Sequence, residues 1–172
     1  MDQKYIDIVE EIKNEFPSFE VVDKKKSILM SLIFNITLMR LWNPHFMETY
    51  VTVMFGKVYM PNHLIGTYTG YQILRHERVH LRDARRWPIL FELSYLLFPL
   101  PFVITMRAYW EYRAYCESLV VQYETYGYVY QGTIDFIVTQ FTSSYYLWMF
   151  PFPKYLNKKF MQFLQERNIP VR

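Results

Sequence analysis

The sequence predicts an α+β protein that is mainly helical, with one small β-sheet or hairpin. Most of the 172 residues lie in stretches with apolar side chains at helical spacing or in long apolar runs, which favours helices. Residues 49–60 are different: β-branched and aromatic side chains surround Gly56, which predicts two short strands in a hairpin. After the hairpin comes an H-E-x-x-H motif, with its histidines at His76 and His80, and the chemistry of that motif requires a helix.

Composition narrows the class of protein. Apolar residues make up 52% of the chain and charged residues 20%, so we expect one folded domain over residues 1–172 rather than disorder. A net charge of +3 argues against a nucleic-acid binder. Cys116 is the only cysteine, which excludes a disulfide framework and a thiolate zinc cluster. The first residues lack the apolar core of a signal peptide, so we expect a cytoplasmic or particle-associated protein.

The other elements follow from periodicity and from glycine or proline breaks. In chain order we expect a helix at 2–15, an extended piece at 19–22, a buried core helix at 27–42, the motif helix at about 71–86, helices at about 88–98 and 105–123, a helix at about 133–146 and a last helix after Pro153. Lys24, Lys25 and Lys26 form a tight basic run, which we interpret as a solvated turn.

Residues 87–105 are long and apolar enough to suggest a membrane span. However, Pro99 and Pro101 would break a helix there, and Glu92 would be costly in lipid. We therefore expect a helical hairpin that brings Glu111 back beside the two histidines. Contact with a membrane surface through 87–105 is the alternative.

The H-E-x-x-H motif suits zinc. His76 and His80 lie one helical turn apart, so both imidazoles can reach one ion. Glu77 sits one step round the helix, where it can act as a general base towards a water molecule at the metal. The alternative is a solvated helix face on which these residues alternate with arginines.

A catalytic zinc site needs a third protein ligand. The extended H-E-x-x-H-x-x-G-x-x-H pattern of the metzincins is excluded, because the chain has Asp83 and Arg86 where that pattern needs Gly and His. A later helix must then supply the ligand, and Glu111 is the best candidate. The weaker candidates are Glu117, Glu124, His45 and His63. The alternative for Glu111 is a surface carboxylate paired with Arg107 or Arg113.

The motif followed by Glu111-x-x-Ala114 resembles the gluzincin zinc metallopeptidases, whose third ligand is a Glu on a downstream helix. The resemblance covers about residues 50–118 and implies a minimal zincin-like domain, with 1–49 and 119–172 as helical flanks. It implies Zn²⁺ ligands at His76, His80 and Glu111. The chain is also similar to small bacterial and phage proteins that share the motif and the apolar proline hairpin.

The chain departs from the gluzincin pattern at one position. The family often has an Asp four residues after the ligand Glu, where it holds the first His, and this chain has Tyr115 there. Tyr115 or Asp83 would have to replace it.

Besides docking on a membrane surface through residues 87–102, two functions remain open at this point. The first is a zinc-dependent metallopeptidase with Glu77 as general base, which binds a peptide or protein substrate along the sheet edge near residues 51–55. The second is a non-catalytic zinc-binding structural protein, a component of a larger particle. An aromatic content of 20% suits the interface with an assembly partner that the second function requires.

Overall fold

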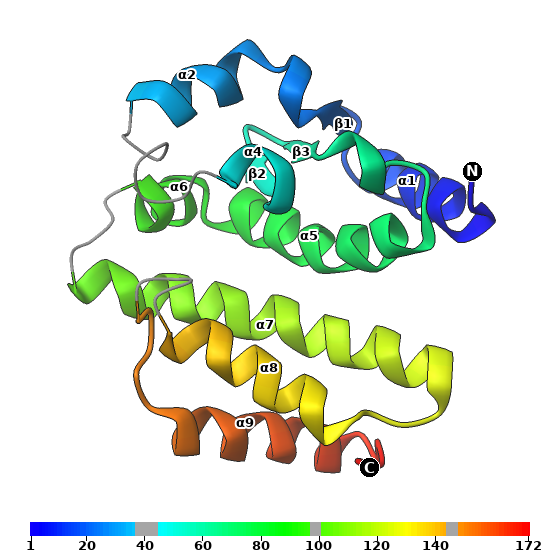
Figure 1. Cartoon of the computed structure of the whole chain (residues 1–172), viewed down its shortest axis with the longest axis vertical. Helices are drawn as coiled ribbons and strands as arrows, with labels where there is room; N and C mark the ends of the chain where they lie inside the picture. Colours follow the sequence, from blue (N-terminus) through cyan, green and yellow to red (C-terminus); the bar gives the residue numbers. More distant parts are fainter. Residues whose placement is uncertain (37–44, 97–100, 144–147) are drawn as a thin grey trace. The chain divides into compact units, whose positions relative to one another are not determined.

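The computed structural model describes residues 1–36, 45–96, 101–143 and 148–172. The chain divides into two compact units, Met1–Leu81 and Arg82–Arg172. The predicted α+β, mainly helical class is confirmed, because the described residues form mostly helices and one three-stranded sheet. Figure 1 shows the elements in chain order.

The first unit contains the sheet and the motif helix. Its elements are α1 (Gln3–Glu15), β1 (Glu20–Asp23), the 3₁₀ helix η1 (Lys24–Lys26), α2 (Ile28–Ile36), α4 (Phe46–Thr49), β2 (Thr52–Met54), β3 (Lys57–Met60), the 3₁₀ helix η2 (Asn62–Leu64) and most of α5 (Tyr68–Arg86). Asp2 caps α1, since its carboxylate accepts a hydrogen bond from the backbone N–H of Tyr5 at 3.3 Å.

The sheet has the strand order β1-β3-β2, which leaves β2 at an edge. β2 and β3 are antiparallel, so the predicted hairpin is confirmed. Its two-residue turn has positive φ at Phe55 (52°) and at Gly56 (75°), a backbone twist that suits right-twisted strands. β1 adds a parallel partner, with Val21 opposite Val58.

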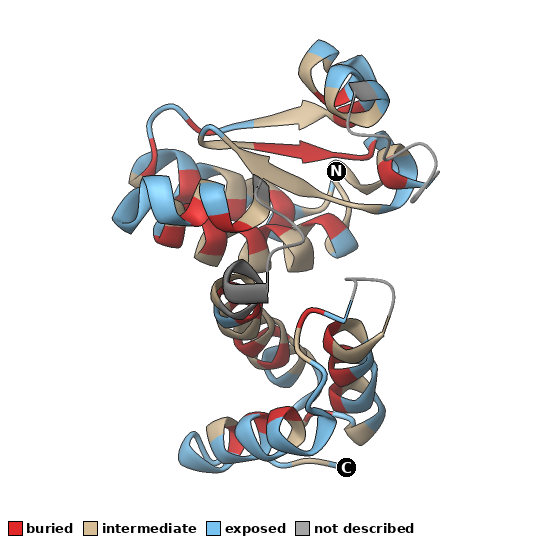
Figure 2. Cartoon of the chain, turned by 90° about the vertical axis from the view of Figure 1, so that its left-hand side faces the viewer, coloured by how far each residue is buried: buried red, intermediate tan, exposed pale blue. Residues whose placement is uncertain are grey.

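Successive side chains of β3 point to opposite faces of the sheet, so the first unit has two hydrophobic cores, one on each face. Val58 and Met60 pack with α1 and α5, whereas Tyr59 points to the opposite face and packs with Met30 and Phe46 from α2 and α4. β3 is therefore the most buried strand, as Figure 2 shows. The sheet thus lies between two layers of helices, and the apolar side of α5 packs against one of its faces.

The helix predicted at residues 27–42 is confirmed for the described part, as α2, but the prediction that it is buried in the core is wrong there. In α2, Ile28 is 78% exposed and Leu32 is 51% exposed, while Met30 is fully buried. A nearly continuous apolar run gave no sign of which side would face the core. Residues 37–42 of the predicted helix lie outside the described residues.

The second unit is a set of helices around a separate core. After the last turn of α5 come α6 (Pro88–Leu96), α7 (Pro101–Tyr126), α8 (Gln131–Thr142) and α9 (Pro153–Glu166). Side chains of α7, α8 and α9 share one apolar cluster, to which Cys116 contributes a buried free thiol. α7 is longer at both ends than the predicted helix at 105–123, because Pro101 is tolerated in a first helical turn.

Outside the described residues lie most of the turn predicted around Pro99 and the last part of the helix predicted at about 133–146. In the part of the chain that the structure does describe, no helix combines the length and the apolar character needed to cross a membrane.

Candidate metal centre

The motif helix α5 is fixed in the first unit by packing and by charge. Leu74 and Leu81 are buried in the core that α5 shares with α1 and the sheet. Arg78, inside the H-E-x-x-H motif, donates from Nε to Glu15 at 2.9 Å and from Nη1 to Glu11 at 2.7 Å, both on α1. These contacts set the rotation of α5 and with it the direction in which the histidines point.

The two motif histidines lie on one face of α5, as predicted. His80 is buried and His76 is half-buried. Their ring centroids are 5.0 Å apart, with the rings 73° from parallel. The helical spacing thus places two imidazole donors side by side.

Glu77 is also buried, with only 8% of its surface exposed. A buried carboxylate requires compensation of its charge. Lys24 supplies part of it, since the negative charge of Glu77 acts to raise the pKa of Lys24. Burial has the larger, opposite effect and lowers the pKa of Lys24 from 10.5 to about 7.

The interpretation of the lysine run as a solvated turn is wrong for Lys24, whose side chain is fully buried. Its Nζ donates to the carbonyl oxygen of Tyr50 at 2.8 Å and to Oγ1 of Thr52 at 3.0 Å, and it lies 3.5 Å from the ring centroid of Phe46. Lys25 is exposed, as the prediction required. Lys24 is therefore a residue of this region that the sequence analysis missed.

Glu111 lies on α7 in the second unit and is only 5% exposed. The alternative of a surface carboxylate is thus wrong. Its Oε1 accepts a hydrogen bond from the Tyr95 hydroxyl of α6 at 3.0 Å. Arg113, one of the two cations considered as partners of Glu111, forms an ion pair with Asp83. The predicted helical hairpin of α6 and α7 thereby supplies Glu111 with a hydrogen-bond donor.

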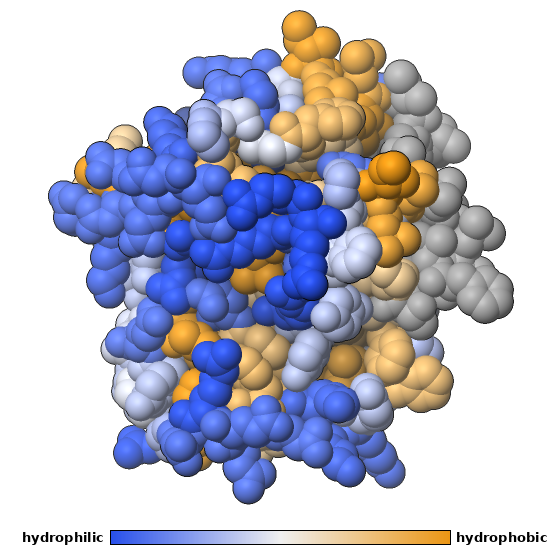
Figure 3. Space-filling view, turned by 180° about the vertical axis from the view of Figure 1, so that it is seen from behind, coloured by the Kyte–Doolittle hydropathy of each residue, from blue (hydrophilic) through white to orange (hydrophobic). Residues whose placement is uncertain are grey.

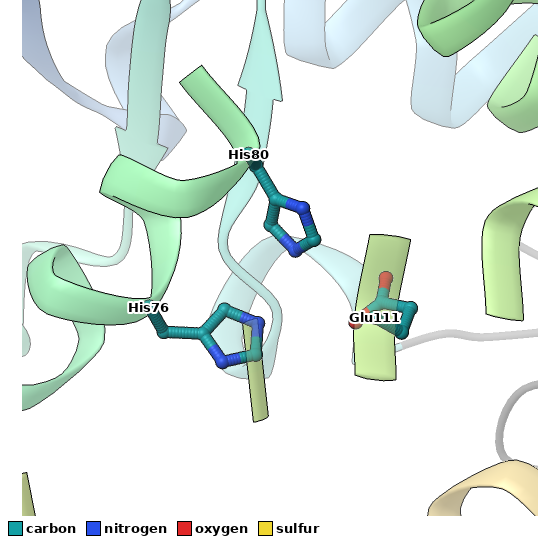
Figure 4. Close-up of side chains that lie close together, drawn as sticks. All are labelled: His76, His80 and Glu111. Atoms are coloured by element: carbon teal, nitrogen blue, oxygen red, sulfur yellow. The ribbon is translucent and has the colours of Figure 1, made fainter. Parts of the chain in front are cut away.

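His76, His80 and Glu111 form a group that could hold a metal ion. One ligand atom from each lies within 4.8 Å of the other two, and Figure 4 shows the three side chains close together. Ligands of a tetrahedral zinc ion are about 3.4 Å apart, since each bond is about 2.1 Å long, so the ligand atoms would have to move closer together to bind one ion. Two imidazoles and one carboxylate are a donor set that zinc accepts, so the residues fit the ion with small side-chain adjustments.

Among the described residues, no other predicted ligand belongs to this group. Glu124, His45 and His63 are exposed, and Glu117 is half-buried on α7. For the position that departs from the gluzincin pattern, the structure packs the Tyr115 ring against Phe141, with ring centroids 5.7 Å apart.

No family model, no curated protein and no solved structure matches this chain.

Proposed function

We propose that this chain is a zinc-dependent metallopeptidase in which His76, His80 and Glu111 bind the ion and Glu77 is the general base. The observation that carries the proposal is the convergence of two imidazoles and one carboxylate within 4.8 Å, next to a buried Glu in the same motif. Ionisable side chains gathered in this way and largely buried are typical of catalytic sites.

When bound, zinc would act as a Lewis acid towards the scissile carbonyl and make water a stronger acid. The residues of the chain do the rest. His76 and His80 are held in direction by the rotation of α5, and the Tyr95 hydroxyl orients the Glu111 carboxylate through its 3.0 Å hydrogen bond.

Glu77 accepts a proton from the attacking water and passes it to the leaving amine. Its burial limits the access of competing water, and its negative charge acts on the nearby Lys24. Lys24 also binds Tyr50 and Thr52 at the start of β2. One buried cation thus links the base to an edge strand of the sheet.

An extended peptide is the substrate class that this edge suits. β2 pairs with β3 on one side, and among the described residues no strand pairs with its other side, so we infer that an added strand can pair there. Strand addition would place the peptide backbone along β2 with side-chain specificity set by alternate positions.

The test compares the wild type with Glu77→Gln, with Glu117→Gln as a matched control on α7. Both variants and the wild type are purified without a metal-chelating tag, zinc is measured by mass spectrometry, and hydrolysis is assayed on a peptide library. We expect about one zinc per chain in all three, with turnover reduced by about 10²-fold or more only in Glu77→Gln.

Hydrolysis at the wild-type rate by Glu77→Gln would contradict the mechanism. A different result, stoichiometric zinc with no hydrolysis by any of the three proteins, would favour the second candidate, a zinc-binding assembly component. Absence of zinc from the wild type after reconstitution would contradict both functions.

A further inference from the structure

α6 carries apolar side chains on two opposite faces. The inner face contains Phe91, which is buried against Trp110 of α7. On the outer face, Ile89 is 76%, Leu90 is 42% and Leu93 is 39% exposed. An apolar helix face is normally covered, and the outer face of α6 is only partly covered within the described residues. Apolar side chains, orange in Figure 3, are visible at the surface of the molecule.

The charged groups that precede this outer face are basic. Arg82, Arg85 and Arg86 are all exposed at the end of α5, whereas Asp83 between them is buried in its ion pair with Arg113. The second unit has ten basic and seven acidic side chains, so it holds the whole net charge of +3, because the first unit has nine of each. Exposed apolar residues are thus combined with positive charge in one short segment.

Trp87 lies where the basic and the apolar parts meet. It is 47% exposed, and the guanidinium carbon of Arg86 is 5.8 Å from its ring centroid. Tryptophan is enriched at membrane–water interfaces, where its ring spans the boundary between lipid headgroups and acyl chains. Arginine at the same depth binds phosphate groups by paired hydrogen bonds.

We propose that this α6 patch, formed by Arg82, Arg85, Arg86, Trp87, Ile89, Leu90 and Leu93, docks on the surface of a bilayer that contains anionic phospholipids. The three aliphatic side chains would enter the interface while the arginines contact headgroup phosphates. α6 has nine residues and is too short to cross a hydrocarbon core of about 30 Å, so it would lie along the interface.

Neighbouring groups are compatible with this arrangement. Glu92, the acidic residue of α6, is half-buried one turn after Ile89, and the three exposed arginines outnumber it. The inner face keeps its contacts with α7, so docking requires no unfolding of the hairpin. The α6 patch contains none of the proposed zinc ligands, so docking requires neither zinc nor peptidase activity.

Vesicle co-sedimentation of the full chain tests the proposal, with vesicles of phosphatidylcholine alone and with added phosphatidylserine. We expect the wild type to bind the vesicles that contain phosphatidylserine, and Ile89→Ser/Leu90→Ser/Leu93→Ser to bind them about tenfold less tightly or worse. Arg85→Gln/Arg86→Gln should weaken binding at low salt by about fivefold for each arginine removed. The matched control is Ile28→Ser/Leu32→Ser, which removes exposed apolar side chains from α2 and should bind like the wild type.

Tryptophan fluorescence gives a second, independent measurement. Vesicles should shift the wild-type emission to shorter wavelength, and Trp87→Phe should lose most of that shift while it still binds. Failure of the wild type to bind phosphatidylserine vesicles, or unchanged binding by the triple serine variant, would overturn the proposal. A third outcome would also overturn it: the wild type does not bind vesicles, and the triple serine variant has a smaller molecular mass in solution. The outer face of α6 would then be a contact between copies of the chain.

Discussion

Lys24 shows how one buried cation can join several elements of the first unit. Its ammonium group has hydrogen bonds to Tyr50 and Thr52 and a contact with the ring of Phe46, so it is partly compensated for the loss of water. The compensation is incomplete, since burial still lowers its pKa to about 7. The folded protein therefore favours the neutral amine above about pH 7.

This shift predicts a specific pH dependence of stability. Between about pH 7 and pH 10.5, Lys24 is protonated in the unfolded chain and mostly neutral in the folded one, so unfolding takes up a proton and stability rises with pH. The wild type should gain stability relative to Lys24→Met across this window, by at most about 1.4 kcal/mol per pH unit. Urea unfolding of both proteins at pH 7, 8 and 9 measures the difference.

The difference in the free energy of unfolding between the wild type and Lys24→Met removes the contributions of the other titrating groups. Lys25→Met, which removes an exposed charge from the same 3₁₀ helix, controls for the change in net charge. Parallel stability curves for the wild type and Lys24→Met would contradict the lowered pKa.

The residues of the candidate site differ in how far sequence could predict them. His76, Glu77 and His80 follow from spacing alone, because a helix puts positions i and i+4 on one face. Glu111 required the additional expectation that two prolines would fold the apolar stretch into a hairpin. Lys24 could not be found in this way. Three consecutive lysines have the same local chemistry, and only the packing of α4 and β2 around the first distinguishes it.

At the scale of elements, the start of α5 depends on close packing at Gly70. A Cβ added there would lie 2.2 Å from the backbone oxygen of Leu64 and about 3.0 Å from the ring of Tyr5. Backbone and a buried aromatic ring can move little, so η2 and α1 approach α5 only because this position has no side chain.

Gly70→Ala should therefore destabilise the protein by about 2 kcal/mol or more, through overpacking and displacement of α5. Gly132→Ala is the matched control in α8: no atom lies within 4 Å of its added Cβ, and alanine is the better helix former by about 1 kcal/mol. Thermal or urea unfolding should thus move in opposite directions for the two variants. Equal effects would show that the contact at Gly70 does not limit the packing of α5.

The local sequence pattern predicted the helices and strands better than it predicted which strands pair. The hairpin follows from β-branched residues around Gly56, and its strands are close in sequence. The parallel pairing of β1 with β3 joins residues that are 37 positions apart, such as Glu20 and Lys57, and no short-range signal specifies it. Likewise, α2 has apolar residues on all sides, so its sequence did not indicate that Ile28 and Leu32 would be exposed.

At the scale of the whole molecule, the proposed metal site connects distant parts of the sequence. Its ligands are on α5 and α7, separated by the α6 hairpin, and the unfolded chain cannot hold them together. An ion that binds only the folded protein stabilises it by RT ln(1 + [L]/Kd), which is about 2.7 kcal/mol when free zinc is 100 times Kd.

Zinc should accordingly raise the melting temperature of the wild type by roughly 5–10 °C, since about 1 kcal/mol corresponds to 2–4 °C for a chain of this size. A chelator should reverse the shift, and His76→Ala/His80→Ala should not show it. Glu111→Ala should show a smaller shift at the same free zinc, because two imidazoles remain, while Glu117→Gln should match the wild type. Calorimetry with buffered zinc measures all four proteins. If Glu111→Ala kept the full shift, the two histidines would bind zinc without α7, and the three-ligand centre would have to be abandoned.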